Sequence, residues 1–239
     1  MNIARQAIIM AAGLGSRLSP VTLRTPKPLI RVNGIRMIDT VIRALHRNGI
    51  REIHIVVGYL KEQFEILEKE YEEIHLIENP FYATCNNISS LYVAREHIEN
   101  AIIIDGDQIV FNEAVLSPKF EKSGYNAIWT ESETEEWLMQ VEGNRVISCS
   151  RTGGAKGWKL YGISRWTSED GKKLRKHLEF EFEERKNRKI YWDDVAMFCH
   201  FKDYDLGIWP MHSGDVLEID SYEELCNLDS SYPRERRNL

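Results

Sequence analysis

The sequence predicts an α/β fold: a Rossmann-like, mostly parallel mixed sheet flanked by helices, with a smaller β-rich part attached. Short apolar runs alternate with helical segments over about the first hundred residues, which is typical of consecutive βαβ units. After Asp107 the pattern changes to several short strands in succession. A chain of 239 residues with 43% hydrophobic residues is large enough to bury such a core.

The first half supplies the parallel strands of the predicted sheet. The expected strands cover residues 7–10, 52–57, 74–77 and 101–105, which are mostly apolar. The expected helices cover residues 36–48, 61–71 and 89–98, and the first two have apolar residues at helical spacing. Gly49 can end the first helix, and a loop over residues 79–87 precedes the third.

The second half is expected to be richer in strands. The predicted strands cover residues 126–130, 137–142, 146–150, 160–164 and 216–219, and the helices cover residues 167–184, 193–198 and a segment from Ser221. Gly143-Asn144 allows a tight turn, and Glu224 can complete a capping box with Ser221. No internal repeat or low-complexity linker interrupts the chain, so we expect one domain over residues 1–239, with halves of about 1–110 and 111–230.

Composition excludes several classes of protein. A net charge of -6 argues against a nucleic-acid partner. The four cysteines form no Cys-x-x-Cys pair, so we expect reduced thiols and no zinc site. No apolar run is long enough to span a membrane, and the N-terminal run lacks a signal-peptide pattern. We therefore expect a cytoplasmic protein without membrane insertion, and a homodimer is compatible with these observations.

A glycine-rich segment after the first strand suits a triphosphate. Small residues and glycines let backbone N–H groups approach phosphate oxygens, and Arg17 and Lys27 add fixed positive charges. A dinucleotide fingerprint is excluded because Leu18 occupies the third glycine position, and no P-loop motif is present. The alternative is an ordinary strand–loop turn with surface cations. The segment is Ala11-Ala12-Gly13-Leu14-Gly15-Ser16-Arg17-Leu18, followed by Thr25-Pro26-Lys27-Pro28-Leu29.

That segment resembles the signature of the sugar-phosphate nucleotidyltransferase superfamily, which implies a GT-A-like nucleotidyltransferase fold. Further motifs resemble the LicC-type CTP:phosphocholine cytidylyltransferases. They are Val57-Gly58-Tyr59-Leu60-Lys61-Glu62-Gln63-Phe64, Asn86-Asn87-Ile88-Ser89-Ser90-Leu91-Tyr92, Ile104-Asp105-Gly106-Asp107, Tyr191-Trp192-Asp193 and Glu218-Ile219-Asp220-Ser221. The resemblance implies that the first half binds the nucleotide and the second half binds the acceptor.

The resemblance assigns the metal and nucleotide residues. Asp107 and Asp220 match the two metal aspartates, and carboxylate oxygens suit Mg²⁺. Asp105 is expected to support this loop, and a helix cap or turn is the alternative role for each Asp. Lys27 and Arg17 would stabilise the phosphates during transfer, so the expected catalytic residues are Lys27, Arg17, Asp107 and Asp220. The remaining nucleotide contacts are expected from Ala11, Ala12, Gly13, Leu14, Gly15, Ser16, Asn86, Asn87 and Ser89, of which the last three have turn formation as their alternative.

Aromatic residues next to carboxylates indicate the acceptor site. Trp137 and Trp192 match cage positions of the phosphocholine subgroup, and tryptophan faces bind quaternary ammonium groups. Tyr191 and Asp193 flank Trp192, and Asp193 would supply negative charge. Lys156, in a glycine-rich loop, would contact the acceptor phosphate. The alternatives are core packing for the tryptophans and an exposed loop position for Lys156.

The resemblance therefore predicts a Mg²⁺-dependent cytidylyltransferase. It would transfer CMP from CTP to phosphocholine, giving CDP-choline and pyrophosphate. Phosphoethanolamine and 2-aminoethylphosphonate are alternative acceptors, because a carboxylate–aromatic pocket also accepts a primary ammonium. A sugar 1-phosphate acceptor and a non-catalytic nucleotide-binding module are further alternatives.

Overall fold

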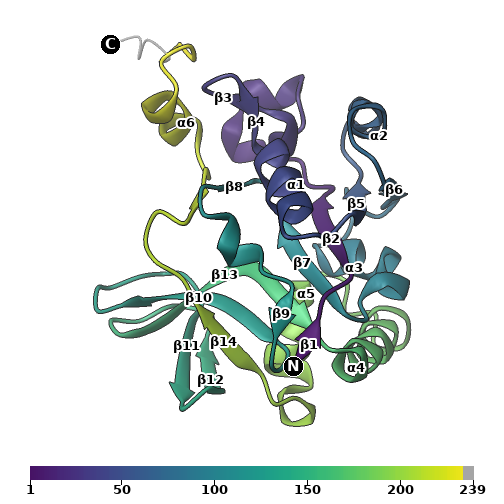
Figure 1. Ribbon diagram of the computed structural model, residues 1–239, viewed down its shortest axis with the longest axis vertical. Helices are drawn as coiled ribbons and strands as arrows, with labels where there is room; N and C mark the ends of the chain where they lie inside the picture. The colour runs from purple at the N-terminus through teal and green to yellow at the C-terminus, as the bar shows by residue number, and fades with distance from the viewer. Residues whose placement is uncertain (234–239) are drawn as a thin grey trace.

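A computed structural model describes residues 1–233. The strands are β1 (Asn2–Ile3), β2 (Gln6–Ala11), β3 (Arg31–Val32), β4 (Ile35–Arg36), β5 (Glu52–Val57), β6 (Ile74–Glu78), β7 (Ala101–Asp105), β8 (Gln108–Val110), β9 (Lys119–Phe120), β10 (Gly124–Thr130), β11 (Leu138–Glu142), β12 (Arg145–Ser150), β13 (Gly157–Trp166), β14 (Gly207–Pro210) and β15 (Val216–Glu218). The helices are α1 (Met37–Arg47), α2 (Glu65–Glu70), α3 (Ile88–Val93), α4 (Ser168–Glu179), α5 (Trp192–Asp194) and α6 (Tyr222–Leu228) (Figure 1).

A nine-stranded mixed sheet forms the centre, in the order β12-β11-β13-β7-β2-β5-β6, and β10 and β14 extend it from β13. The strands β7, β2, β5 and β6 are parallel neighbours, as their apolar runs predicted. The strand β13 then joins β7 in the antiparallel direction and connects the β-rich second half to the same sheet. This confirms the predicted fold class.

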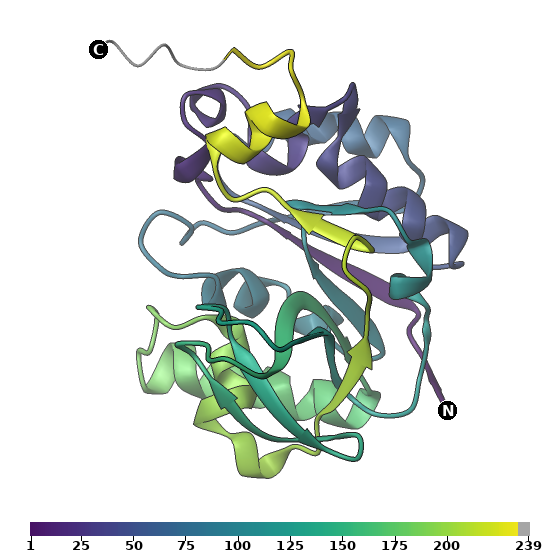
Figure 2. The ribbon, with the colours of Figure 1, turned by 90° about the vertical axis from the view of Figure 1, so that its left-hand side faces the viewer.

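Helices cover both faces of the sheet (Figure 2). Along β2, Ile9 belongs to the core shared with α1 and α2, whereas Ile8 belongs to the core shared with α3, α4 and α5. Successive residues of a strand point to opposite faces, so a strand covered on both faces is apolar throughout. In the described part of the chain, no helix has the length and apolar character needed to cross a membrane.

Some elements differ from the sequence prediction. The helix expected over residues 89–98 ends at Val93, and a short 3-10 helix over Arg95–His97 follows it. The helix expected over residues 167–184 is α4 followed by a π-helical segment, Phe180–Glu184. Three further pairings were not predicted: the β3–β4 hairpin, the β10–β14 pair and the β8–β15 ribbon.

The β8–β15 ribbon matters most for the site. Gln108 pairs with Glu218, and the Gln108 side chain donates a hydrogen bond to Glu218 Oε1 at 2.8 Å. Asp107 lies just before β8 and Asp220 lies just after β15. Because the ribbon is antiparallel, both aspartates lie at the same end of it.

Candidate active site

A cleft of about 500 Å³ lies at the carboxyl ends of β2 and β7, where parallel α/β sheets bind ligands. It brings together most of the residues singled out from the sequence. Those that line it are Ala11, Ala12, Gly13, Gly15, Ser16, Arg17, Lys27, Asn87, Asp105, Asp107, Trp137, Tyr191, Asp193 and Asp220. Leu14, Asn86, Ser89, Lys156 and Trp192 are outside this lining.

The loop after β2 is shaped by Gly15 and Leu18. Gly15 has a φ of 60°, and a Cβ there would lie 3.0 Å from Lys27 Cβ, so both conformation and space require glycine. Leu18 is buried in one cluster with Ile219 and Leu225 from the C-terminal part of the chain. This packing holds Arg17, the residue before Leu18, next to Asp220, the residue after Ile219.

Lys27 connects the two aspartates. Its Nζ lies 2.7 Å from Asp107 Oδ2 and 3.3 Å from Asp220 Oδ1. Arg17 Nη2 contacts the same Asp220 oxygen at 2.8 Å. The side chain of Lys27 is only 9% exposed, whereas that of Arg17 is 72% exposed. Lys27 is therefore fixed in the wall of the cleft, and Arg17 can follow a ligand.

The charge of Lys27 is held by its partners. Burial alone would lower the pKa of Lys27, but the carboxylates of Asp107 and Asp220 outweigh it and raise that pKa above its ordinary value. Lys27 therefore stays protonated at neutral pH and can neutralise a phosphate.

The donor set of Asp107 and Asp220 fits Mg²⁺. Both carboxylates contact one ammonium nitrogen, so their oxygens converge on a small volume at the cleft. Oxygen ligands from one or two carboxylates, completed by phosphate and water, are the usual protein contribution to a Mg²⁺ site.

Asp105 lies deeper in the cleft. Burial, with the charges of Asp107 and Asp193, raises the pKa of Asp105 well above its ordinary value. The strand β13 passes directly over it, because a Cβ on Gly162 would lie 2.0 Å from Asp105 Oδ2. A glycine inside a strand is the sequence signal for such a close approach, although the sequence alone did not point to Gly162.

The second half contributes an acidic and aromatic wall. Glu136 and Trp137 precede β11, and Tyr191 and Asp193 come from the start of α5. The rings of Trp137 and Tyr191 meet edge to face, with centroids 5.9 Å apart. Asp193 Oδ1 and the neighbouring Tyr125 hydroxyl are buried, and neither forms a hydrogen bond of good geometry in residues 1–233. Burial raises the pKa of Asp193 to about 8, although the Tyr125 hydroxyl partly opposes this rise.

Trp192 lies in the core rather than in the cleft. It is 2% exposed and packs between Tyr125 and Trp166, with ring centroids 6.0 and 6.2 Å away. Its backbone N–H donates to Asn87 Oδ1 at 2.9 Å. Trp192 therefore positions its neighbours Tyr191 and Asp193, and Tyr191 is the aromatic residue that shares the cleft with Trp137.

The polar residues near α3 hold the local structure together. The Asn86 side chain donates to Lys189 O at 3.1 Å, and Ser89 Oγ accepts from Asn79 at 3.0 Å. Within the turn itself, Asn86 Oδ1 accepts from Asn87 N and Ser89 Oγ donates to Asn86 O, both at 2.8 Å, and these contacts match the alternative role given for Asn86 and Ser89. Ser90 lines the cleft in place of Ser89 and lay within the same motif.

Lys156 extends from its loop toward Glu131, and Lys156 Nζ lies 2.9 Å from Glu131 Oε1.

Two further carboxylates, Glu136 and Glu218, line the cleft, and neither was assigned a role from the sequence. Each belongs to a segment in which a neighbouring residue was assigned one. Burial raises the pKa of Glu218 to about 7.

Comparisons with known proteins found relatives of this chain. The family described as MobA-like NTP transferase domain matches residues 7–158. The chain is 38% identical to the 2-aminoethylphosphonate cytidylyltransferase of Lancefieldella rimae, over 95% of this chain and 92% of that protein. It is 32% identical to the choline-phosphate cytidylyltransferase of Streptococcus pneumoniae, over 94% of this chain and 96% of that protein.

Solved structures also resemble this chain. The CTP:phosphocholine cytidylyltransferase LicC of Streptococcus pneumoniae superposes with a TM-score of 0.88 at 32% identity, covering 96% of this chain and 100% of that chain. The inositol-1-phosphate CTP transferase of T. maritima shares the fold, with a TM-score of 0.73 at 19% identity, over 98% of this chain and 99% of that chain.

Proposed function

Because the chain belongs to the MobA-like NTP transferase family and is a cytidylyltransferase, we propose that its acceptor is a small phosphonate or phosphate with a primary ammonium group. The leading acceptor is 2-aminoethylphosphonate, on which the Lancefieldella rimae relative is named to act. Phosphoethanolamine has the same charged groups and is the nearest alternative.

The observation that carries this proposal is the buried Asp193 Oδ1 in the acidic wall, which forms no hydrogen bond of good geometry. With a pKa of about 8, the Asp193 carboxyl is largely protonated at neutral pH when the cleft is empty. A bound ammonium would favour its ionised form and would satisfy Oδ1 with both a hydrogen bond and a charge. A quaternary ammonium has no N–H to donate and depends on aromatic faces. Only Trp137 and Tyr191 offer such rings among the described residues that line the cleft.

In the proposed reaction, an acceptor oxygen attacks the α-phosphorus of CTP. A new P–O bond forms, the bond to the bridging oxygen breaks, and pyrophosphate leaves with that electron pair. The attacking oxygen is already ionised at neutral pH, so no strong general base is required. Catalysis then depends on positioning and on charge stabilisation.

The residues of the cleft have separate roles in this proposal. Lys27 and Arg17 neutralise charge on the α-phosphate and on the departing pyrophosphate. Backbone N–H groups of the loop from Gly13 to Ser16 bind phosphate oxygens. Asp107 and Asp220 would hold Mg²⁺, which when bound supplies further neutralisation of the phosphates.

Phosphocholine is the second candidate acceptor. The edge-to-face pair of Trp137 and Tyr191 favours it, because aromatic faces bind methylated cations. The Streptococcus pneumoniae relative is named as a choline-phosphate enzyme.

The test is pyrophosphate release from CTP and Mg²⁺ with four acceptors in parallel: 2-aminoethylphosphonate, phosphoethanolamine, phosphocholine and glucose 1-phosphate. We expect the highest kcat/KM with a primary-ammonium acceptor. A preference for phosphocholine would be consistent with cytidylyl transfer but would refute the proposal that Asp193 binds a primary ammonium group. Release with glucose 1-phosphate alone, or with none of the four, would refute the proposed function.

A further inference from the structure

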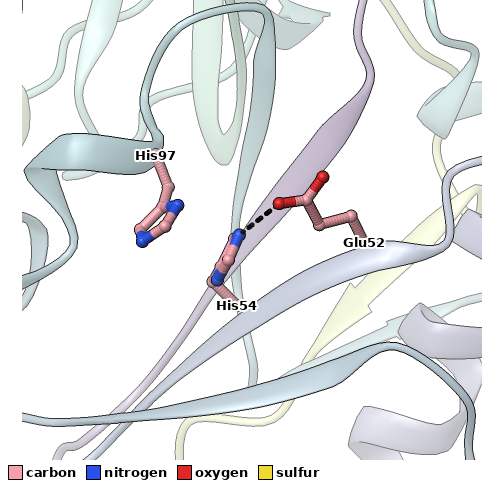
Figure 3. A group of neighbouring side chains, drawn as sticks. All are labelled: Glu52, His54 and His97. Carbon is pink, nitrogen blue, oxygen red and sulfur yellow. Dashed lines mark hydrogen bonds and ion pairs between the residues drawn. The ribbon is translucent and has the colours of Figure 1, made fainter.

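A second cluster of metal-ligating side chains lies away from the cleft. Glu52 and His54 belong to the amino-terminal part of β5, and His97 ends the short helix after α3. One ligand atom of each lies within 4.8 Å of the ligand atoms of the other two. Figure 3 shows His54 between His97 and Glu52. The cleft lies at the carboxyl ends of the parallel strands, and none of these three residues lines it.

We propose that Glu52, His54 and His97 bind one divalent transition-metal ion, with Zn²⁺ as the best fit. Two imidazoles and one carboxylate form a common three-residue zinc set, with water in the fourth position. Mg²⁺ prefers oxygen ligands and keeps most of its water. The chemistry of this cluster therefore differs from that of Asp107 and Asp220, and the two sites can be titrated separately.

The imidazole of His54 is prepared for metal binding. Its side chain is 6% exposed, and its Nε2 lies 3.3 Å from Glu52 Oε1. Burial, with the nearby His97, lowers the pKa of His54 to about 4. The ring is therefore neutral at neutral pH, which is the form that a metal requires.

His97 can complete the site by a side-chain rotation. Its ring stacks on His54 with centroids 3.6 Å apart and planes 25° apart, so the two in-plane lone pairs do not yet converge. The ring of His97 is partly exposed and forms no hydrogen bond or ion pair within residues 1–233. Bonds of about 2.0–2.1 Å in a tetrahedral site place ligand atoms about 3.3 Å apart, so His97 must unstack from His54 and turn until its lone pair points at the same ion.

Neighbouring charges favour a cation at this position. Glu52 and Glu96 both act on His97 and oppose the burial that lowers its pKa. His75, from β6, stacks on His54 with ring centroids 5.3 Å apart and is exposed. The titratable groups that face the cluster are thus two carboxylates and three imidazoles. No lysine or arginine is among the interactions of His54 and His97, so no such side chain opposes a divalent cation there.

The fold offers a matched control in a second histidine pair. His177 and His200 stack with ring centroids 3.8 Å apart and approach Asp203. One nitrogen of each ring is hydrogen-bonded, because His177 Nδ1 lies 2.8 Å from the Tyr204 hydroxyl and His200 Nε2 lies 3.0 Å from Glu181 Oε1. The other nitrogens, His177 Nε2 and His200 Nδ1, lie 3.8 and 3.7 Å from Asp203 Oδ2, so this cluster is the rival metal site. Substitution of both histidines tests which of the two clusters holds the ion.

The experiment is a titration of the full, chelator-treated chain with Co²⁺ and Zn²⁺ near pH 7.5. We expect one tetrahedral Co²⁺ per chain by visible absorption, displacement by Zn²⁺ but not by millimolar Mg²⁺, and a Tm that rises with Zn²⁺ concentration. His97→Gln, a partly exposed position, should weaken binding by roughly 100-fold or more, since even the loss of a residue that only orients a metal ligand costs about 10- to 100-fold. Glu52→Gln should weaken it too, and H177Q/H200Q should bind as the unaltered chain does.

Three results would overturn the proposal: no stoichiometric Co²⁺ binding, unchanged affinity in His97→Gln, or loss of binding in H177Q/H200Q. Cytidylyl transfer by His97→Gln in Mg²⁺ should stay within about twofold of the unaltered chain, because His97 is outside the cleft. The metal titration contains no CTP, so its outcome is independent of the proposed function.

Discussion

At the scale of single residues, Lys27 controls the electrostatics of the cleft. Its Nζ lies 2.7 Å from Asp107 and 3.3 Å from Asp220, so one ammonium group neutralises charge on both carboxylates. Its Cβ also lies against Gly15, which leaves no room for a side chain there. Both packing and charge therefore fix this ammonium group next to the place where the phosphates are proposed to bind.

Lys27→Ala should lower kcat by about 100-fold or more, because one preorganised charge donor typically contributes that much to a developing anion. Pyrophosphate release measures the rate, and circular dichroism checks the fold. Lys61→Ala is the matched control, since Lys61 pairs with Glu78 at 2.6 Å and does not line the cleft. Near-normal kcat in a folded Lys27→Ala variant would contradict the role of Lys27.

Sequence motifs located the charged residues of the cleft but not the direction of every neighbouring side chain. Lys27, Asp107 and Asp220 all line the cleft as expected, and their catalytic and metal-binding roles stay predictions. Trp192 was expected beside Trp137, but its ring lies in the core with Tyr125 and Trp166. Side-chain direction in a short helix depends on the packing around it, which residue type and motif position do not specify.

At the scale of elements, β13 shapes the floor of the cleft. It pairs antiparallel with β7, and its Gly162 leaves space for the Asp105 carboxyl and the Gln108 amide. Gln108 in turn pairs with Glu218 in the β8–β15 ribbon that carries Asp107 and Asp220. A change at Gly162 in β13 would therefore shift Gln108 and, through the ribbon, alter the positions of both Asp107 and Asp220.

Gly162→Ala should impair both stability and activity. The new Cβ would meet Asp105 Oδ2 at 2.0 Å and Gln108 Nε2 at 3.1 Å, so both side chains must move. Overpacking of this kind costs about 1–3 kcal/mol of unfolding free energy, and we expect kcat to fall by about tenfold or more. Urea unfolding and pyrophosphate release would test this, and unchanged values of both would show that the floor is not constrained as described.

Long apolar runs predicted their elements well, and short or polar ones did not. The runs behind β2, β5 and β7 became parallel strands at nearly the expected residues. The helix expected to continue to Ile98 ends at Val93, where the Arg95 side chain donates to Tyr92 O at 2.8 Å. β14 has only four residues, including Trp209 and Pro210, and its pairing with β10 is set by tertiary contacts.

At the scale of the whole molecule, the cleft is assembled from segments far apart in the chain. Lys27 contacts Asp220 across 193 residues, and the shared cluster of Leu18, Ile219 and Leu225 brings these segments together. The second half adds Trp137, Tyr191 and Asp193 to the same cleft. The division into a nucleotide half and an acceptor half stays a prediction.

The most direct test of the proposed acceptor compares two matched compounds, 2-aminoethylphosphonate and ethylphosphonate, with the unaltered chain and with Asp193→Asn. A hydrogen bond to a charged group contributes about 1.5–3 kcal/mol, so the unaltered chain should prefer the ammonium compound by about 10- to 100-fold in kcat/KM. Asp193→Asn should lose most of that preference while the rate with ethylphosphonate stays unchanged. If Asp193→Asn keeps the full preference, Asp193 does not recognise the acceptor and the central claim fails.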